Sequence, residues 1–161
     1  MFEHGFVDDE TLPVARANVH TALETLRADP RVEGDRIGLW FFSAGGLLMG
    51  SFLDRVPAGV IAVAGTYAAV ADPDLDGTDL LQAVDTAATS AVSLLLVRPE
   101  HDFDWIVPET GVLLERCVAA GRAIDVIDVP GGHHGFETVD DTDESREGVR
   151  RSIAWWVQAL L

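Results

Sequence analysis

Short apolar runs alternate with helical patterns along this chain, and the alternation limits the possible folds more than any other feature. The runs cover residues 37–42, 60–64, 92–97 and 124–129, and apolar residues recur at helical spacing over 11–28, 44–55, 107–120 and 145–160. Strands of a parallel sheet are buried on both faces, so they read as continuous rather than alternating apolar runs. The sequence therefore predicts an α/β fold, a mostly parallel sheet of about four strands with helices on both faces.

The fourth run differs from the others because Asp125 and Asp128 interrupt it, which suits a strand at the edge of the sheet. Leu80, Leu81 and Val84 predict a further short helix, and the stretch over 71–78 has the composition of a polar turn. We find no repeat, low-complexity tract or linker. The whole chain, residues 1–161, is therefore expected to form a single domain.

Composition excludes several classes of partner. The net charge is -16, and every positive side chain is arginine. Such an acidic surface repels nucleic acids and anionic membranes. No apolar run approaches the roughly 20 residues that span a bilayer, and acidic residues occupy the N-terminal region, so we expect a cytoplasmic protein. The single cysteine, Cys117, lies in a helical pattern and is expected to be a buried thiol.

Ser43 follows the first apolar run directly and precedes Ala44-Gly45-Gly46. A serine on a sharp turn between a strand and a helix has its hydroxyl exposed, and the amide of the next residue, here Ala44, is free to bind an oxyanion. The motif lacks the first glycine of G-x-S-x-G, because Phe41 occupies that position. Taken alone, the pattern also fits an ordinary turn at the end of a strand.

Polar residues with catalytic chemistry follow two further strands. Arg98-Pro99-Glu100-His101-Asp102 ends the third run, and Gly131-Gly132-His133-His134-Gly135-Phe136 follows the fourth. In a parallel sheet the carboxyl ends of the strands meet at one edge, where active sites collect. Ser, Asp and His also come in the chain order of an α/β-hydrolase triad. Agreement between three independent loops is stronger evidence than any one motif.

Some assignments stay open at this level. Glu100 and Asp104 compete with Asp102 for the role of the acid, and His133 competes with His134 for that of the base. Arg98 could bind a substrate carboxylate, although an ion pair with Glu100 or Asp102 is the simpler expectation.

A metal site is the weaker interpretation of the acidic, histidine-containing region near the end of the chain. Its candidate ligands, His133, His134, Asp140 and Asp141, lack the spacing of a zinc motif, and a solvated acidic loop has the same composition.

The segments RIGLWFFSAGG, LLLVRPEHD and PGGHHGF resemble the α/β-hydrolase superfamily, in particular its dienelactone-hydrolase-like and small-esterase branch, and the resemblance covers nearly the whole chain. It implies that Ser43 is the nucleophile, Asp102 the acid and His134 the base, because the family's histidine commonly precedes a small residue and an aromatic one. It implies a small-molecule ester substrate and no cofactor. Dienelactone hydrolases proper use cysteine at the position of Ser43, so ester hydrolysis is the closer expectation.

The same resemblance implies a truncated α/β-hydrolase fold. The family's sheet usually has about eight strands, and this chain matches the C-terminal half, without the N-terminal strands or the loop that supplies the second oxyanion donor. The strand from Arg36 to Phe42 would then be an exposed apolar edge, which we expect to be covered by a second copy in a homodimer, by a partner subunit, or by an upstream region.

Two rival functions remain. The chain could be a catalytically silent half-domain or interaction subunit that keeps the triad residues. A nucleotide-binding module is remote, because the sequence has no G-x-G-x-x-G motif and no P-loop.

Overall fold

The structure, a computed structural model, describes residues 8, 10–71, 80–86 and 92–161. Four parallel strands form one sheet in the order β1-β2-β3-β4. They are β1 (Ile37–Phe42), β2 (Val60–Thr66), β3 (Ser93–His101) and β4 (Asp125–His133). The predicted α/β architecture is confirmed, with β1 at one edge and the acidic strand β4 at the other.

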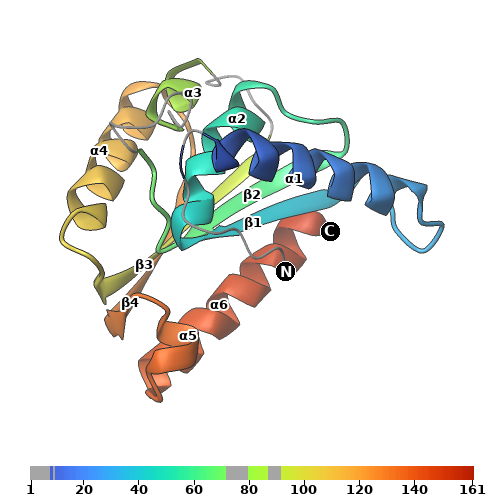
Figure 1. Cartoon of the computed structure of the whole chain (residues 1–161). Helices are drawn as coiled ribbons and strands as arrows, with labels where there is room; N and C mark the ends of the chain where they lie inside the picture. Colours follow the sequence, from blue (N-terminus) through green and yellow to red (C-terminus); the bar gives the residue numbers. More distant parts are fainter. Residues whose placement is uncertain (1–7, 9, 72–79, 87–91) are drawn as a thin grey trace.

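Helices cover both faces of the sheet, as Figure 1 shows. One face packs against α1 (Thr11–Ala28), α2 (Met49–Asp54), α3 (Leu80–Thr86) and α4 (Ile106–Ala119). The opposite face packs against α6 (Asp143–Leu160), which the short α5 (Phe136–Val139) connects to β4. No helix in the described ranges is both long and apolar enough to cross a membrane. Cys117, fully buried in α4, is a core thiol.

The continuous apolar runs divide between two cores. In β3, Leu94 and Leu96 contact the larger core under α1 to α4, whereas Leu95 and Val97 contact the smaller core under α6. All four side chains are at most 2% exposed. Burial on both faces explains why this strand has no polar alternation.

β3 and β4 extend further than the sequence predicted, so Arg98 to His101 and Gly131 to His133 lie in strands rather than in loops. His101 pairs with His133 beyond an irregularity that follows Pro99. β4 tolerates Pro130, Gly131 and Gly132 because an edge strand makes ladder bonds on one side only, and Pro99 lies beyond Val97, the last residue of β3 that pairs with β2. β2 likewise continues to Thr66.

The start of the helix after β1 also differs from the prediction. The helix expected from Ala44 begins as a 3-10 helix, η1 (Ser43–Leu48), and becomes α-helical only at Met49. Gly46 packs against the Ala69 backbone so closely that a side chain would collide there. α1 begins at Thr11, and the carboxylate of Asp8 accepts the Thr11 amide at 2.7 Å, which satisfies a free donor at the start of the helix. The polar turn predicted over 71–78 falls almost wholly outside the described residues.

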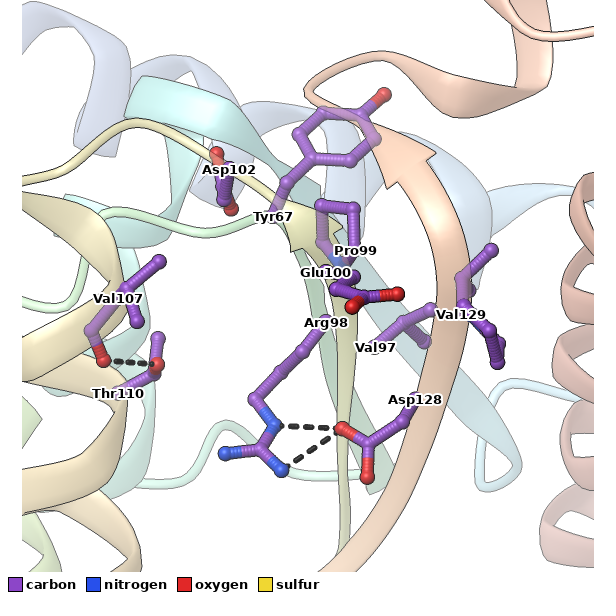
Figure 2. Close-up of a pocket in the computed structure, with 11 residues that line it drawn as sticks. Tyr67, Val97, Arg98, Pro99, Glu100, Asp102, Val107, Thr110, Asp128 and Val129 are labelled. Atoms are coloured by element: carbon purple, nitrogen blue, oxygen red, sulfur yellow. Dashed lines mark hydrogen bonds and ion pairs between the residues drawn. The ribbon is translucent and has the colours of Figure 1, made fainter.

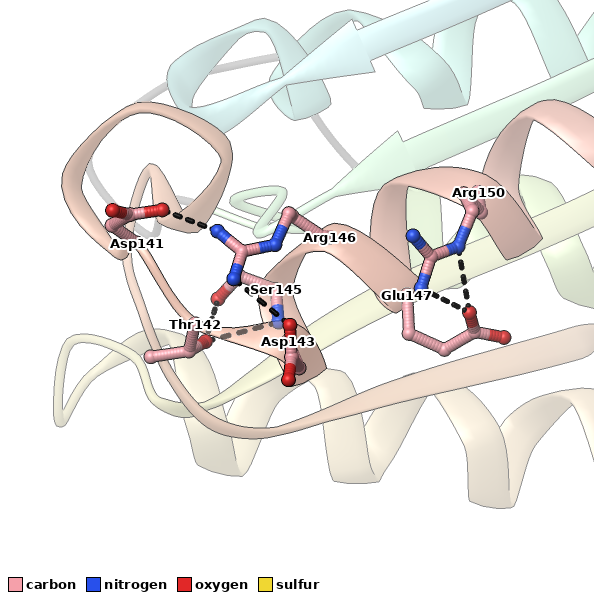
Figure 3. A network of polar contacts seen from close by, with 7 residues as sticks. All are labelled: Asp141, Thr142, Asp143, Ser145, Arg146, Glu147 and Arg150. Atoms are coloured by element: carbon pink, nitrogen blue, oxygen red, sulfur yellow. Dashed lines mark hydrogen bonds and ion pairs between the residues drawn. The ribbon is translucent and has the colours of Figure 1, made fainter.

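A cluster of polar contacts fixes the start of α6 (Figure 3). The Thr142 hydroxyl accepts the Ser145 amide at 3.1 Å, which satisfies a free donor in the first turn. Arg146 forms ion pairs with Asp141 and Asp143. Because α5 and this cap follow β4 directly, they fix the path of the chain just after His134.

Candidate active site

Ser43 begins η1 immediately after β1 and has a φ of 52°. A non-glycine residue in this left-handed region is strained, and such strain concentrates at functional sites. Phe41, which replaces the glycine of the usual motif, is buried and stacks on Phe52 of α2 with ring centroids 5.9 Å apart. The predicted sharp turn is therefore present, with an aromatic ring filling the space between β1 and α2.

The structure brings together the three residues that the sequence singled out. The Ser43 hydroxyl lies 2.8 Å from Nε2 of His134, and Nδ1 of the same ring lies 2.6 Å from Oδ1 of Asp102. The two distances fit a neutral imidazole whose Nδ1–H donates to Asp102 while Nε2 accepts from Ser43. The side chains of Asp102 and His134 are 4% and 18% exposed, so both contacts are largely shielded from water.

The competing candidates make other contacts. Glu100 accepts the Gly131 amide at 2.8 Å, and Asp104 is exposed. His133 is exposed and binds Asp140 through its backbone amide at 2.7 Å and through Nδ1 at 3.0 Å. The hydrogen bond from the His133 amide holds the pKa of the Asp140 carboxyl below its usual value. His133 thus ties the β4–α5 segment together rather than facing Ser43.

A cavity of about 280 Å³ lies beside Asp102, between the ends of β3 and β4 and the start of α4. Figure 2 shows Asp102 and Tyr67 at one end of it and an ion pair between Arg98 and Asp128 at the other. The expected partners of Arg98, Glu100 and Asp102, are therefore replaced by Asp128, which faces Arg98 across the β3–β4 register. Ser43 and His134 do not line this cavity, so we do not place the reaction in it.

Tyr67, which sequence reasoning missed, lies at the end of β2 with a φ of 38°. Its ring is 4.5 Å from the His134 ring, and its hydroxyl donates to the Glu137 carboxylate. Burial, with the Glu137 hydrogen bond and charge, raises the pKa of the Tyr67 hydroxyl above its ordinary value. Tyr67 therefore remains a neutral donor. The sequence analysis named candidate residues at the ends of the other three strands but none at the end of β2. That absence could have directed attention to Tyr67.

Phe103 was also missed. Its backbone amide donates to Oδ1 of Asp102 at 2.8 Å, the same oxygen that binds His134. Its ring stacks on the His134 imidazole, with centroids 4.4 Å apart and planes inclined by 29°. Phe103 therefore contacts both Asp102 and His134. Its position in an acidic turn, next to Asp102 and Asp104, concealed it in the sequence.

Within the ranges that the structure describes, no group of three or more His, Cys, Asp or Glu side chains could hold a metal ion. His101 and His133 have ring centroids 5.1 Å apart, but they form no such group.

Comparison with solved structures relates the fold to known proteins. A carboxyl esterase 2 from the fungus Tuber melanosporum superposes on 87% of this chain with a TM-score of 0.71 and 18% identity. A Klebsiella pneumoniae protein described as a dienelactone hydrolase covers 95% of the chain, with a TM-score of 0.71 and 19% identity. This chain has an α/β-hydrolase-type fold. A puromycin-hydrolyzing peptidase from Mycobacterium tuberculosis matches 91% of it, with a TM-score of 0.70 and 16% identity.

The α/β-hydrolase fold is represented here only in part. The chain spans 60% of the esterase, 63% of the dienelactone hydrolase and 25% of the peptidase. No protein-family model and no curated protein sequence matches this chain.

Proposed function

We propose that this protein is a serine hydrolase that cleaves small uncharged esters or related acyl compounds through Ser43, His134 and Asp102. The observation that supports it most is the pair of contacts at His134, 2.8 Å to Ser43 and 2.6 Å to Asp102, at the carboxyl end of a parallel sheet. Nucleophile, base and orienting acid in one hydrogen-bonded line are the pattern of an activated nucleophile. The esterases and peptidases among the similar folds agree with this proposal.

In this mechanism the Ser43 hydroxyl attacks the substrate carbonyl while His134 accepts its proton at Nε2. Asp102 keeps the imidazole in the correct tautomer and stabilises the imidazolium. His134 then passes the proton to the leaving oxygen, and the acyl group remains on Ser43 until water, activated by the same imidazole, releases it. No step requires a cofactor.

The developing oxyanion would be bound by the backbone amide of Ala44, an exposed residue. Family enzymes add a second donor from another loop, and loss of one such donor costs about 10²- to 10³-fold in rate. In the part of the chain that the structure describes, we assign no second donor. We therefore propose a slow hydrolase as an isolated chain, and a faster one when a partner or upstream segment supplies the missing amide.

The test is labelling with a fluorophosphonate followed by peptide mass spectrometry. A single modified peptide containing Ser43, lost in Ser43→Ala and kept in Ser93→Ala, is the expected result, because only an activated serine reacts with such a probe. Ser93 is an exposed serine at the start of β3 and serves as the matched control. Label on any other serine, or none on Ser43, would contradict the proposal.

The rival proposal is an interaction subunit that has kept the triad geometry without its activity. The exposed aromatic side chains of the edge strand β1, Trp40 and Phe42, favour it. The labelling experiment separates the two functions, because a silent subunit leaves Ser43 unlabelled. An assay with a p-nitrophenyl ester should agree, since a silent subunit hydrolyses none even at high protein concentration.

A further inference from the structure

Two exposed aromatic side chains stand next to the candidate base. Phe103 and Trp105 are 51% and 53% exposed, and their rings lie nearly parallel with centroids 6.5 Å apart. Phe103 also stacks on the His134 imidazole at 4.4 Å. Large aromatic side chains normally bury much of their area, so this pair forms an apolar surface that reaches from the imidazole to solvent.

The direction of proton transfer identifies which part of a substrate would lie there. In ester hydrolysis the acyl group is bonded to Ser43, whereas the leaving oxygen must be close to Nε2 of His134 to receive its proton. Substituents on that oxygen therefore extend along the imidazole rather than along the acyl group. Phe103 and Tyr67 both contact the imidazole, but Phe103 is exposed and Tyr67 is buried, so Phe103 is the ring that such a substituent can reach.

Building on the proposed function, we infer that Phe103 and Trp105 form the subsite for the alcohol part of the ester. The favoured substrates are esters of uncharged aromatic alcohols. An aromatic ring from the alcohol gains stacking area on Phe103 and Trp105, whereas a methyl group does not.

Charge restricts the alcohol further. Asp104 lies between the two aromatic residues in the sequence and is exposed, and Asp102 binds the imidazole itself. Glu137 binds the hydroxyl of Tyr67, whose ring contacts the imidazole, and the whole chain has a net charge of -16. An anionic alcohol would meet repulsion from these carboxylates. The subsite therefore discriminates against a carboxylated ring, and added salt weakens that discrimination.

A pair of isomeric esters tests the inference. Benzyl acetate carries its ring on the alcohol and methyl phenylacetate carries it on the acyl group, with the same atoms overall. In Phe103→Leu and in Trp105→Leu, kcat/KM for benzyl acetate should fall about 3- to 10-fold, mainly through a higher KM, because a stacking contact contributes to ground-state and transition-state binding alike. In each variant the fall for benzyl acetate should exceed any fall for methyl acetate by about 3-fold or more, because methyl acetate has no ring to stack.

Trp155→Leu is the matched control, because Trp155 is a partly exposed tryptophan on α6. It should leave the ratio of the kcat/KM values for the two isomers unchanged. Phe103→Tyr keeps the ring and should restore the preference for benzyl acetate. If kcat/KM in Phe103→Leu falls equally for both isomers and for methyl acetate, the inference is overturned, and the role of Phe103 is to position His134. If kcat/KM falls more for methyl phenylacetate than for benzyl acetate, the inference is also overturned, because the acyl group would then be the part that contacts Phe103 and Trp105.

A binding measurement keeps the inference testable even without turnover. Benzyl alcohol at millimolar concentration should shift the indole N–H resonance of Trp105, assigned through Trp105→Leu, and phenylacetate should not, because its carboxylate is repelled. If wild type hydrolyses no ester, the proposed function fails while this shift still supports the aromatic subsite. If benzyl alcohol leaves the Trp105 resonance unchanged, the inference fails whatever the activity.

Discussion

The two edge strands of the sheet are built in opposite ways. β4 exposes Asp125 and Asp128, which bind Trp155 of α6 and Arg98 of β3. β1 contains no charged residue and instead exposes Trp40 at 36% and Phe42 at 41%. Charges on an edge strand oppose pairing with another sheet, whereas an uncharged aromatic edge permits it.

The two edges also hold different parts of the candidate site. At the β4 side, His134 is bound by Asp102, contacted by the rings of Tyr67 and Phe103, and tied into a segment that His133 fastens to Asp140. At the β1 side, Ser43 contacts His134, and the following residue, Ala44, is exposed.

This difference suggests which part of the site depends on another molecule. His134 is held by contacts within the chain, whereas the proposed oxyanion donor Ala44 lies next to β1, the edge strand without charged residues. We propose that association occurs at β1 and that it affects the oxyanion site rather than the triad contacts. The predictions below test the two sides separately.

The largest expected effect is at the base. His134→Ala should reduce kcat/KM for a short p-nitrophenyl ester about 10⁶-fold, because nucleophile and base act as one unit. His133→Ala should retain substantial activity, since His133 contacts Asp140 and not Ser43. Steady-state kinetics on both variants provide the measurement, and a reversed pattern would assign the base to His133.

The acid should matter less, although still strongly. Asp102→Asn should lower kcat about 10⁴-fold by favouring the wrong imidazole tautomer. Asp104→Asn is the control, because Asp104 is exposed and directly follows Phe103 in the chain. Comparable losses in the two variants, measured under saturating substrate, would leave the acid unassigned.

The β1 edge should control assembly. We expect light scattering to give twice the 17.3 kDa mass of the chain. A two-fold axis at β1 lets the apolar surface of one copy pack against the same surface of the other copy. Phe42→Lys should return the mass to that of a monomer by placing a charge at the contact. Val118→Lys, at a side chain 80% exposed on α4, should not. A stable monomeric wild type would show that β1 needs no such partner.

The smallest effect concerns Tyr67, the only tyrosine in the chain. Because the pKa of Tyr67 is raised in the folded protein, the stability that it contributes is fully present below about pH 10.0 and is lost as the pH rises towards the folded-state value. Tyrosinate absorbance should thus be delayed in the folded protein relative to the denatured chain. Tyr67→Phe should cost about 1 kcal/mol at neutral pH, measured by urea unfolding, and a normal tyrosinate titration in the folded state would contradict the prediction.

Local patterns were sufficient for much of this molecule. The helix over Thr11–Ala28 and the strand over Ile37–Phe42 follow from periodicity and from breakers that lie within a few residues of each end. Ser43, Asp102 and His134 were identifiable because each follows the end of a predicted strand, and parallel strands bring their carboxyl ends to one edge of the sheet. Their meeting is thus a consequence of topology that the sequence already implied.

Other features depend on neighbours that are distant along the chain. The choice of His134 over His133 rests on which ring lies at Ser43, since adjacent residues differ little in sequence but point differently in space. The partner of Arg98 was set by strand register, and the roles of Tyr67 and Phe103 arise only where their rings reach His134. The sequence by itself determined the order of elements and the chemistry at the ends of three strands, because periodicity and turn residues are local. Only the tertiary structure decided which side chains touch, because that depends on register and packing between segments far apart in the chain.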